Sequence, residues 1–214
     1  MIPIGDDNSQ RKSTPVVTYA LIAANILFFL LELSGGEEFM KQWAFTPSRF
    51  LAHPAADFIT IFTSMFMHAG IAHIAGNMLY LWIFGDNVED RMGKVPFLIF
   101  YLVCGIAATF SQLAFDPASN LPNVGASGAI AGVLGAYILL YPAEKINVLI
   151  GQSTMQVPAL IVIGFWFLIQ FISGIGSTAA TDSSGGVAYM AHIGGFITGL
   201  IIAIFYRNSA SSQK

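Results

Sequence analysis

Two histidines and a serine lie inside long apolar stretches of this 214-residue chain, where ionisable side chains are costly and usually mark function. Ser127 opens the apolar stretch 127–141, and His192 lies in the stretch 187–206. A serine hydroxyl is a weak nucleophile until a base accepts its proton, and a neutral imidazole is such a base. The two residues therefore predict a Ser-His dyad for acyl transfer, with Ser127 as nucleophile and His192 as general base.

Acyl transfer also needs hydrogen-bond donors for the oxyanion that develops on the attacked carbonyl group. His73 and Asn77 are spaced i,i+4, which places both side chains on one face of a helix. Further donors are the free backbone N–H groups of a helix that starts at Ser127, where Gly128 leaves the backbone uncovered. An alternative for His73 and Asn77 is ordinary hydrogen bonding between neighbouring helices.

Six apolar stretches are candidates to carry these residues through a membrane, because about 20 apolar residues in a helix cross the hydrocarbon core. They cover residues 16–33, 72–88, 95–115, 127–141, 157–173 and 187–206. The sequence therefore predicts an all-α polytopic membrane protein, built as a bundle of six transmembrane helices.

The fourth stretch is too short to cross a bilayer, since 15 residues form a helix of only about 22 Å. Residues 116–124, which precede it, contain two prolines and two asparagines. Irregular backbone inside a membrane is tolerated only where protein buries it or water reaches it. We therefore expect a short central fourth helix and a water-filled depression that opens outward, with Ser127 at its floor.

Two glycine pairs indicate how the dyad is brought together. Gly128 and Gly132 form a GxxxG pair in the fourth stretch, and Gly195 and Gly199 form another in the sixth. Such pairs let helix backbones approach closely. Close packing of these two helices would bring His192 within hydrogen-bond reach of Ser127.

Composition excludes several classes of protein. Apolar residues make up 55% of the chain and charged residues 10%, which excludes a disordered or fibrous protein and disfavours a water-soluble globule. A net charge of −3, with nine scattered Lys and Arg, provides no basic patch for nucleic acid. The single cysteine, Cys104, forms neither an internal disulfide nor a cysteine-rich metal site.

The distribution of positive charge predicts the orientation, because Lys and Arg near span ends are held on the cytoplasmic side. Most of these residues fall on one side of the predicted membrane: Arg11, Lys12, Arg91, Lys94, Lys145, Arg207 and Lys214. Both termini are therefore predicted to be cytoplasmic. Solvated tails over 1–14 and 208–214 would flank a single six-helix domain over 15–207. The connection 34–71 would lie outside, in the headgroup region.

Taken together, these residues resemble the rhomboid family of intramembrane serine proteases. The matching groups are His68 to His73 with Asn77, Gly85 through Glu89 to Arg91 and Gly93, Gly125 to Gly128, and Ala191 to Gly195. They occur in the family's order on the second, fourth and sixth stretches, and the similarity covers roughly residues 58–206.

The resemblance implies a rhomboid-type fold and an endopeptidase that cuts the transmembrane helices of single-span or polytopic substrates near their outer ends. It implies an oxyanion site formed by His73, Asn77 and the backbone N–H of Ser127, with Gly125 and Gly128 beside it. The fifth span and the loop 174–186 would act as gate and cap. Structural roles fall to His68, Glu89, Arg91, Gly132, Gly195 and Gly199. The implied partners are membrane proteins and the lipid bilayer, with no nucleic acid, metal or cofactor.

Two positions depart from patterns common in the family. Ile59-Thr60 stand where many members have Trp-Arg, which leaves open how the outer loop is anchored. Ala131 stands one helical turn after Ser127, where some members place a tyrosine that stacks on the catalytic histidine. How His192 is oriented is therefore open at this point.

Two alternatives belong to other functional classes. In a proton-coupled transporter, His73 and His192 would relay protons and the short fourth helix would be a broken helix at a midplane site. In a non-catalytic relative, the depression above Ser127 would bind membrane proteins without cutting them. The short tails suit the plasma membrane of a prokaryote, as a multi-pass protein.

Overall fold

The computed structural model describes residues 1–7, 9, 11–177 and 188–211, and most of them are helical. The long helices are α1 (Val16–Trp43), α5 (Ile71–Met92), α6 (Lys94–Phe115), α7 (Ser127–Leu140), α8 (Ala159–Ser177) and α9 (Tyr189–Ser211). Short helices α2 (Pro47–Ala52), α3 (Pro54–Asp57) and α4 (Thr60–Thr63) and the 3-10 turn η1 (Ser64–Phe66) lie between α1 and α5. The prediction of an all-α polytopic membrane protein is confirmed.

The main part of each predicted apolar stretch lies on one long helix. Within the described residues, three helices have the length and hydropathy of a span: Val16–Trp43, Lys94–Phe115 and Tyr189–Arg207. A fourth candidate is the pair Pro54–Phe66 and Ile71–Met92, which is bent by 76°, and the shorter apolar helices are Ser127–Leu140 and Ala159–Ile172. The number six for the spans stays a prediction. Helix α1 continues to Trp43, past its predicted end, with non-helical backbone at Gly36.

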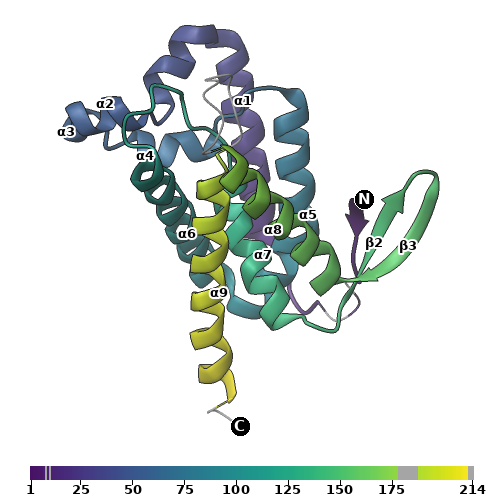
Figure 1. Cartoon of the computed structure of the whole chain (residues 1–214). Helices are drawn as coiled ribbons and strands as arrows, with labels where there is room; N and C mark the ends of the chain where they lie inside the picture. The colour runs from purple at the N-terminus through teal and green to yellow at the C-terminus, as the bar shows by residue number, and fades with distance from the viewer. Residues whose placement is uncertain (8, 10, 178–187, 212–214) are drawn as a thin grey trace.

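Helix α7 lies in the middle of the bundle, in contact with α5, α6, α8 and α9 (Figure 1). Ten of its fourteen residues are buried, and they lie on all sides of the helix. A helix surrounded in this way needs small side chains, which Gly128, Ala129, Gly132 and Gly135 supply.

Backbone contact joins α7 to α9. A Cβ added at Gly195 would collide with the carbonyl oxygen of Gly128, and a Cβ added at Gly199 would collide with that of Gly132. The two GxxxG pairs predicted to pack together therefore face each other across this contact. On its other side, α7 meets α6, where a Cβ at Gly128 would lie 2.5 Å from the Cβ of Ala108.

A three-stranded antiparallel sheet, not expected from the apolar stretches, lies beside the helices. Strand β1 (Ile2–Gly5) pairs with β2 (Lys145–Ile150), which pairs with β3 (Ser153–Pro158). The β2–β3 hairpin projects away from the bundle next to the N-terminal strand (Figure 1). It turns at Gly151, whose φ of +61° suits a residue without a Cβ.

The N-terminal segment is tied to the bundle, in contrast to the predicted solvated tail. Asp6 accepts hydrogen bonds from the hydroxyl of Tyr137 at 2.8 Å and from the amide of Asn87. Arg11 forms an ion pair with Asp86 at 2.9 Å. Desolvation raises the pKa of Asp6 to about 6, and the nearby Asp86 adds to the shift, although the two hydrogen bonds oppose it.

Glu89 holds the start of α1 against the end of α5. Its buried carboxylate accepts hydrogen bonds from the backbone N–H groups of Val17 and Thr18, at 3.0 and 2.7 Å, and from the Thr18 hydroxyl at 2.8 Å. A negative charge at the first turn of a helix satisfies its free N–H groups and complements its dipole. This contact accounts physically for the structural role expected of Glu89.

The connection between α1 and α5, which has Ile59-Thr60 in place of Trp-Arg, is anchored by three polar contacts. Arg49 forms an ion pair with Asp57 at 2.6 Å and donates to the carbonyl oxygen of Ala44 at 2.6 Å. The Thr63 hydroxyl donates to the carbonyl oxygen of Trp43 at 2.7 Å. These bonds fold the short helices α2 to α4 back onto the end of α1.

Gly195→Ala should lower the thermal stability of the protein in detergent micelles, because the new methyl group meets the Gly128 carbonyl and forces α7 and α9 apart. Overpacking of this kind typically costs about 1–3 kcal/mol. Gly164→Ala on α8 is the matched control, since a Cβ there has no neighbour within 4 Å. Equal melting temperatures for the two variants, measured by scanning fluorimetry, would contradict the close contact.

The Asp6 contact should make stability depend on pH. Because the pKa is raised from 3.8 to about 6 in the folded protein, the contribution of protonated Asp6 is complete below pH 3.8 and is lost as the pH rises through 6. Melting temperatures at pH 4.5 and 7.5 should therefore differ more in the wild type than in Asp6→Asn. Asp7→Asn, at an exposed position, should behave as the wild type does.

Candidate active site

Ser127 and His192 lie in hydrogen-bond contact, with the serine Oγ 2.7 Å from the histidine Nε2. Ser127 is the first residue of α7 and is half-buried, whereas His192 lies in the first turns of α9 and is only 7% exposed. The contact depends on the glycine packing of α7 against α9 described above. In this geometry the imidazole can accept the hydroxyl proton as the oxygen attacks a carbonyl carbon.

The backbone before α7 is fixed by contacts to the connection between α1 and α5. The N–H of Asn123 donates to the carbonyl oxygen of Phe45 at 2.7 Å, and the N–H of Gly125 donates to that of Ser64 at 2.9 Å. Gly125 has a φ of +128°, a conformation that side chains disfavour. These contacts set the point at which α7 starts, and with it the position of Ser127.

His73 and Asn77 face the same region from α5. A Cβ added at Gly125 would lie 2.9 Å from Nε2 of His73 and 3.5 Å from Oγ of Ser127, so the absent side chain leaves the space between them open. Asn77 is buried, and its Nδ2 has no hydrogen-bond partner among the described residues. An interhelical hydrogen bond from this nitrogen, the alternative role, is therefore missing. The structure thus brings together Ser127, His192, His73, Gly125 and Gly128, and Asn77 lies one helical turn after His73 on α5.

His68 packs edge-on against His73, and its ring nitrogens form no hydrogen bond with a described residue. Its ring is fully buried, edge-on to His73 with centroids 5.1 Å apart, and edge-on to Phe29 at 6.5 Å. Its backbone N–H donates to the buried carboxylate of Glu32 at 2.9 Å, which fixes the turn before α5. His68 therefore packs against the ring of His73 and fixes the turn that leads into α5. Arg91 is exposed, and its carbonyl oxygen accepts a bond from the Tyr206 hydroxyl.

Two residues of α8 hold the imidazole, and sequence analysis missed both. Nδ1 of His192 lies 2.7 Å from Oε1 of Gln170. The Trp166 ring lies against the same imidazole, with centroids 5.7 Å apart and an interplanar angle of 39°. These two contacts orient the His192 ring, since the methyl group of Ala131 cannot stack on it. The available signal was Gln170 itself, the one glutamine in the apolar stretch 157–173.

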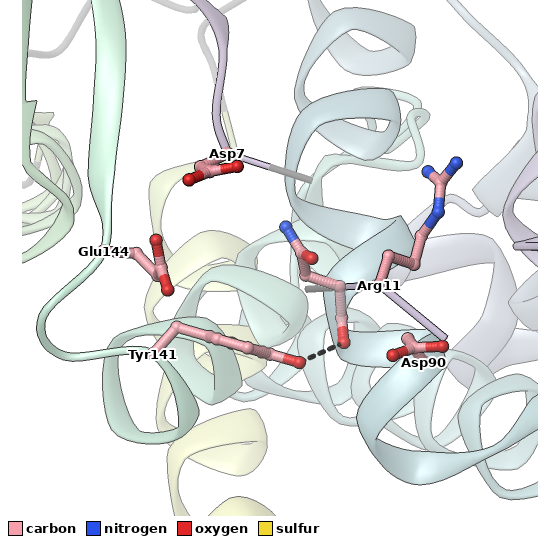
Figure 2. Close-up of a pocket in the computed structure, with 6 residues that line it drawn as sticks. Asp7, Arg11, Asp90, Tyr141 and Glu144 are labelled. Carbon is pink, nitrogen blue, oxygen red and sulfur yellow. Dashed lines mark hydrogen bonds between the residues drawn. The ribbon is translucent and has the colours of Figure 1, made fainter. Parts of the chain in front are cut away.

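A separate small cavity lies at the opposite end of α7. It has a volume of about 20 Å³, room for about one water molecule, and is lined by Asp7, Arg11, Asn87, Asp90, Tyr141 and Glu144. Figure 2 shows the Tyr141 hydroxyl, which donates to the Asn87 carbonyl oxygen at 2.7 Å. Since α7 is about 20 Å long, this cavity is remote from the dyad.

No group of three or more His, Cys, Asp or Glu side chains in the described part of the chain is arranged to hold a metal ion. The loop 174–186, predicted to cap the site, lies outside the described residues over 178–186, and 174–177 form the end of α8. The gate, the cap and a reaction without metal or cofactor stay predictions.

The Rhomboid domain family matches residues 55–209, which is more than half of the chain and covers α5 to α8 and nearly all of α9. The chain belongs to the rhomboid family. This finding confirms the resemblance drawn from the sequence motifs, and the matched region agrees with the predicted 58–206.

Several curated relatives resemble this rhomboid over most of its length. Rhomboid protease GluP of Bacillus subtilis is 35% identical over 90% of this chain and 35% of its own length. Rhomboid protein 1, mitochondrial, of Saccharomyces cerevisiae is 29% identical over 92% of this chain and 55% of its own. Putative rhomboid protease YdcA of Bacillus subtilis is 26% identical over 88% of this chain and 87% of its own. This rhomboid thus spans about a third and about half of the first two relatives.

Proposed function

We propose that this protein is an intramembrane serine endopeptidase that hydrolyses peptide bonds in or near the transmembrane helices of membrane proteins. The observation that carries the proposal is the 2.7 Å contact between Oγ of Ser127 and Nε2 of His192 at the start of a helix inside an apolar bundle. Two relatives named as rhomboid proteases support the same activity.

The reaction follows from the groups at the site. Oγ of Ser127 attacks the carbonyl carbon of the scissile bond while Nε2 of His192 takes the hydroxyl proton. The tetrahedral intermediate expels the amine, which receives that proton from the imidazolium, and an acyl-enzyme ester remains. Water then attacks the ester while its proton passes to His192. The imidazolium returns this proton to Oγ of Ser127 as the acid product leaves, so both residues are regenerated.

The oxyanion is assigned to donors on two helices. Helix α7 offers the N–H groups of its first turn, which have no intrahelical acceptors and lie at the positive end of the helix dipole. Helix α5 offers the Nδ2 of Asn77 and the ring of His73, and the missing side chain at Gly125 leaves room for the substrate carbonyl group beside them. Gly128, in contrast, is buried and packed against Ala108 of α6. Donors fixed in place before the reaction stabilise the developing charge without reorganisation.

The substrate class follows from the location of the site. A peptide bond within a substrate helix is shielded until the helix unwinds, so substrates with small residues at the cut and a locally unstable helix are favoured. We assign the protein to the cell membrane of a prokaryote, with both termini cytoplasmic and Ser127 toward the outer surface. Helix α8 and the segment after it would gate lateral entry.

Ser127→Ala and His192→Ala should both abolish labelling of the purified protein by a fluorophosphonate probe, because the first lacks the nucleophile and the second lacks the base. The same variants should fail to cleave a fluorescent single-span substrate in proteoliposomes. Cys104→Ala, buried but without a role in the site, is the control for labelling. Labelling that survives His192→Ala would remove the dyad, and wild type that neither labels nor cleaves would favour a non-catalytic relative.

Asn77→Ala should lower kcat by roughly 10²–10³-fold, the typical loss for one oxyanion donor, and leave the melting temperature unchanged. Stability is expected to hold because Nδ2 forms no hydrogen bond with a described residue. Thr18→Val is the control for a loss of stability, because the hydroxyl of Thr18 donates a hydrogen bond to the buried carboxylate of Glu89. It should lower the melting temperature and keep activity at permissive temperature. A loss of stability in Asn77→Ala without loss of kcat would assign Asn77 to packing.

A further inference from the structure

We propose that Gln170 of α8 is the positioning residue of the dyad. Its side-chain carbonyl oxygen accepts the Nδ1–H of His192, which leaves the Nε2 lone pair directed at the hydroxyl of Ser127. The inference rests on the proposed function. It adds a hydrogen-bonded series of Ser127, His192 and Gln170, which lie on α7, α9 and α8. Gln170 itself touches no reacting atom.

Both ring nitrogens of His192 are engaged, on opposite sides of the ring. Nε2 lies 2.7 Å from Oγ of Ser127, and Nδ1 lies 2.7 Å from Oε1 of Gln170. The histidine is 7% exposed, so Gln170 supplies at Nδ1 the hydrogen bond that water would supply to an exposed imidazole. A hydrogen bond to one ring nitrogen decides which nitrogen carries the proton.

The amide carbonyl selects the productive tautomer. With an oxygen facing Nδ1, the proton resides on Nδ1, and Nε2 is the acceptor that a general base requires. With the amide NH2 facing Nδ1, the proton would reside on Nε2, which would then donate to Ser127 and could not remove its proton. The orientation of one glutamine amide thus separates a competent dyad from an incompetent one.

Helix α8 also fixes the plane of the ring. Trp166 and Gln170 are one helical turn apart on the same face of α8. Trp166 lies against the imidazole with centroids 5.7 Å apart, and Gln170 bonds its edge. The Ala131 methyl group, one turn after Ser127, cannot supply such a contact from α7. Both constraints on His192 that do not involve Ser127 therefore come from α8.

His73 of α5 is the titratable group that interacts electrostatically with His192. In the described part of the chain, neither a carboxylate nor a lysine is hydrogen-bonded to the His192 ring. The acceptor at Nδ1 is therefore neutral. A neutral acceptor sets the tautomer without a charge that would stabilise the imidazolium, so replacing it by a carboxylate should have a defined effect on the pH profile.

The test compares Gln170→Met and Gln170→Glu with the wild type. Methionine keeps the length of the side chain and lacks the carbonyl acceptor, so we expect kcat to fall about tenfold or more with KM changed less than threefold. Glutamate keeps the acceptor, so kcat should be retained, and the acid limb of kcat/KM should move to higher pH because the carboxylate favours imidazolium. Leu168→Met, on the exposed face of α8, is the matched control and should behave as the wild type does.

A second readout does not depend on activity. In 15N-histidine-labelled protein, His192 is assigned by comparison with His192→Ala, and the nitrogen shifts should show Nδ1 protonated and Nε2 unprotonated in the wild type. Gln170→Met should show a mixture of tautomers. Nε2 protonated in the wild type would overturn the inference, even if a variant fails to fold.

The kinetic outcomes are equally decisive. Full activity of Gln170→Met overturns the inference, and so does an equal loss in Gln170→Met and Gln170→Glu, which would indicate a role in shape alone. If the wild type neither cleaves substrate nor reacts with fluorophosphonate, the proposed function fails, and the nitrogen shifts still decide whether Gln170 sets the tautomer.

Discussion

The contact of α7 with α9 through facing glycines is the constraint on which the rest of the structure depends. The 2.7 Å separation of Ser127 and His192 requires helix backbones closer than ordinary side chains allow. Gly195 against the Gly128 carbonyl and Gly199 against the Gly132 carbonyl provide this approach. Because α7 is then surrounded by α5, α6, α8 and α9, its own residues must be small. The same small residues that let α7 occupy the centre of the bundle also bring Ser127 to His192.

Buried carboxylates serve as anchors in this molecule. Glu89 caps α1 from the end of α5, and Glu32, in α1, fixes the turn before α5 through the N–H of His68. Both bind backbone donors, so each charge is compensated where solvent is scarce. The two contacts lie toward opposite ends of α5 and hold it against α1. As a result, the face of α5 that carries His73 and Asn77 keeps a fixed position beside α7.

Features that depend on residues close together in the sequence were predicted well. The irregular run before Ser127 and the small residues after it predicted the start of α7 to the residue, and GxxxG pairs predicted its partner. Features that depend on distant pairing were missed. Strand β1 has four residues and no pattern of its own, and Asp6 meets Tyr137 only because the chain returns after 131 positions. Gln170 likewise meets His192 across 22 positions and two different helices, a pairing that no local pattern predicts.

The position of Trp166 and Gln170 on α8 has a pharmacological consequence. Residues on the outer face of this helix, including Leu160, Phe165 and Leu168, are more than half exposed and would meet lipid. A small apolar molecule wedged between α8 and α9 would separate the imidazole from both its supports while leaving the serine untouched. Under the proposed mechanism, such a compound would act as a reversible inhibitor from the bilayer side, without an electrophilic warhead.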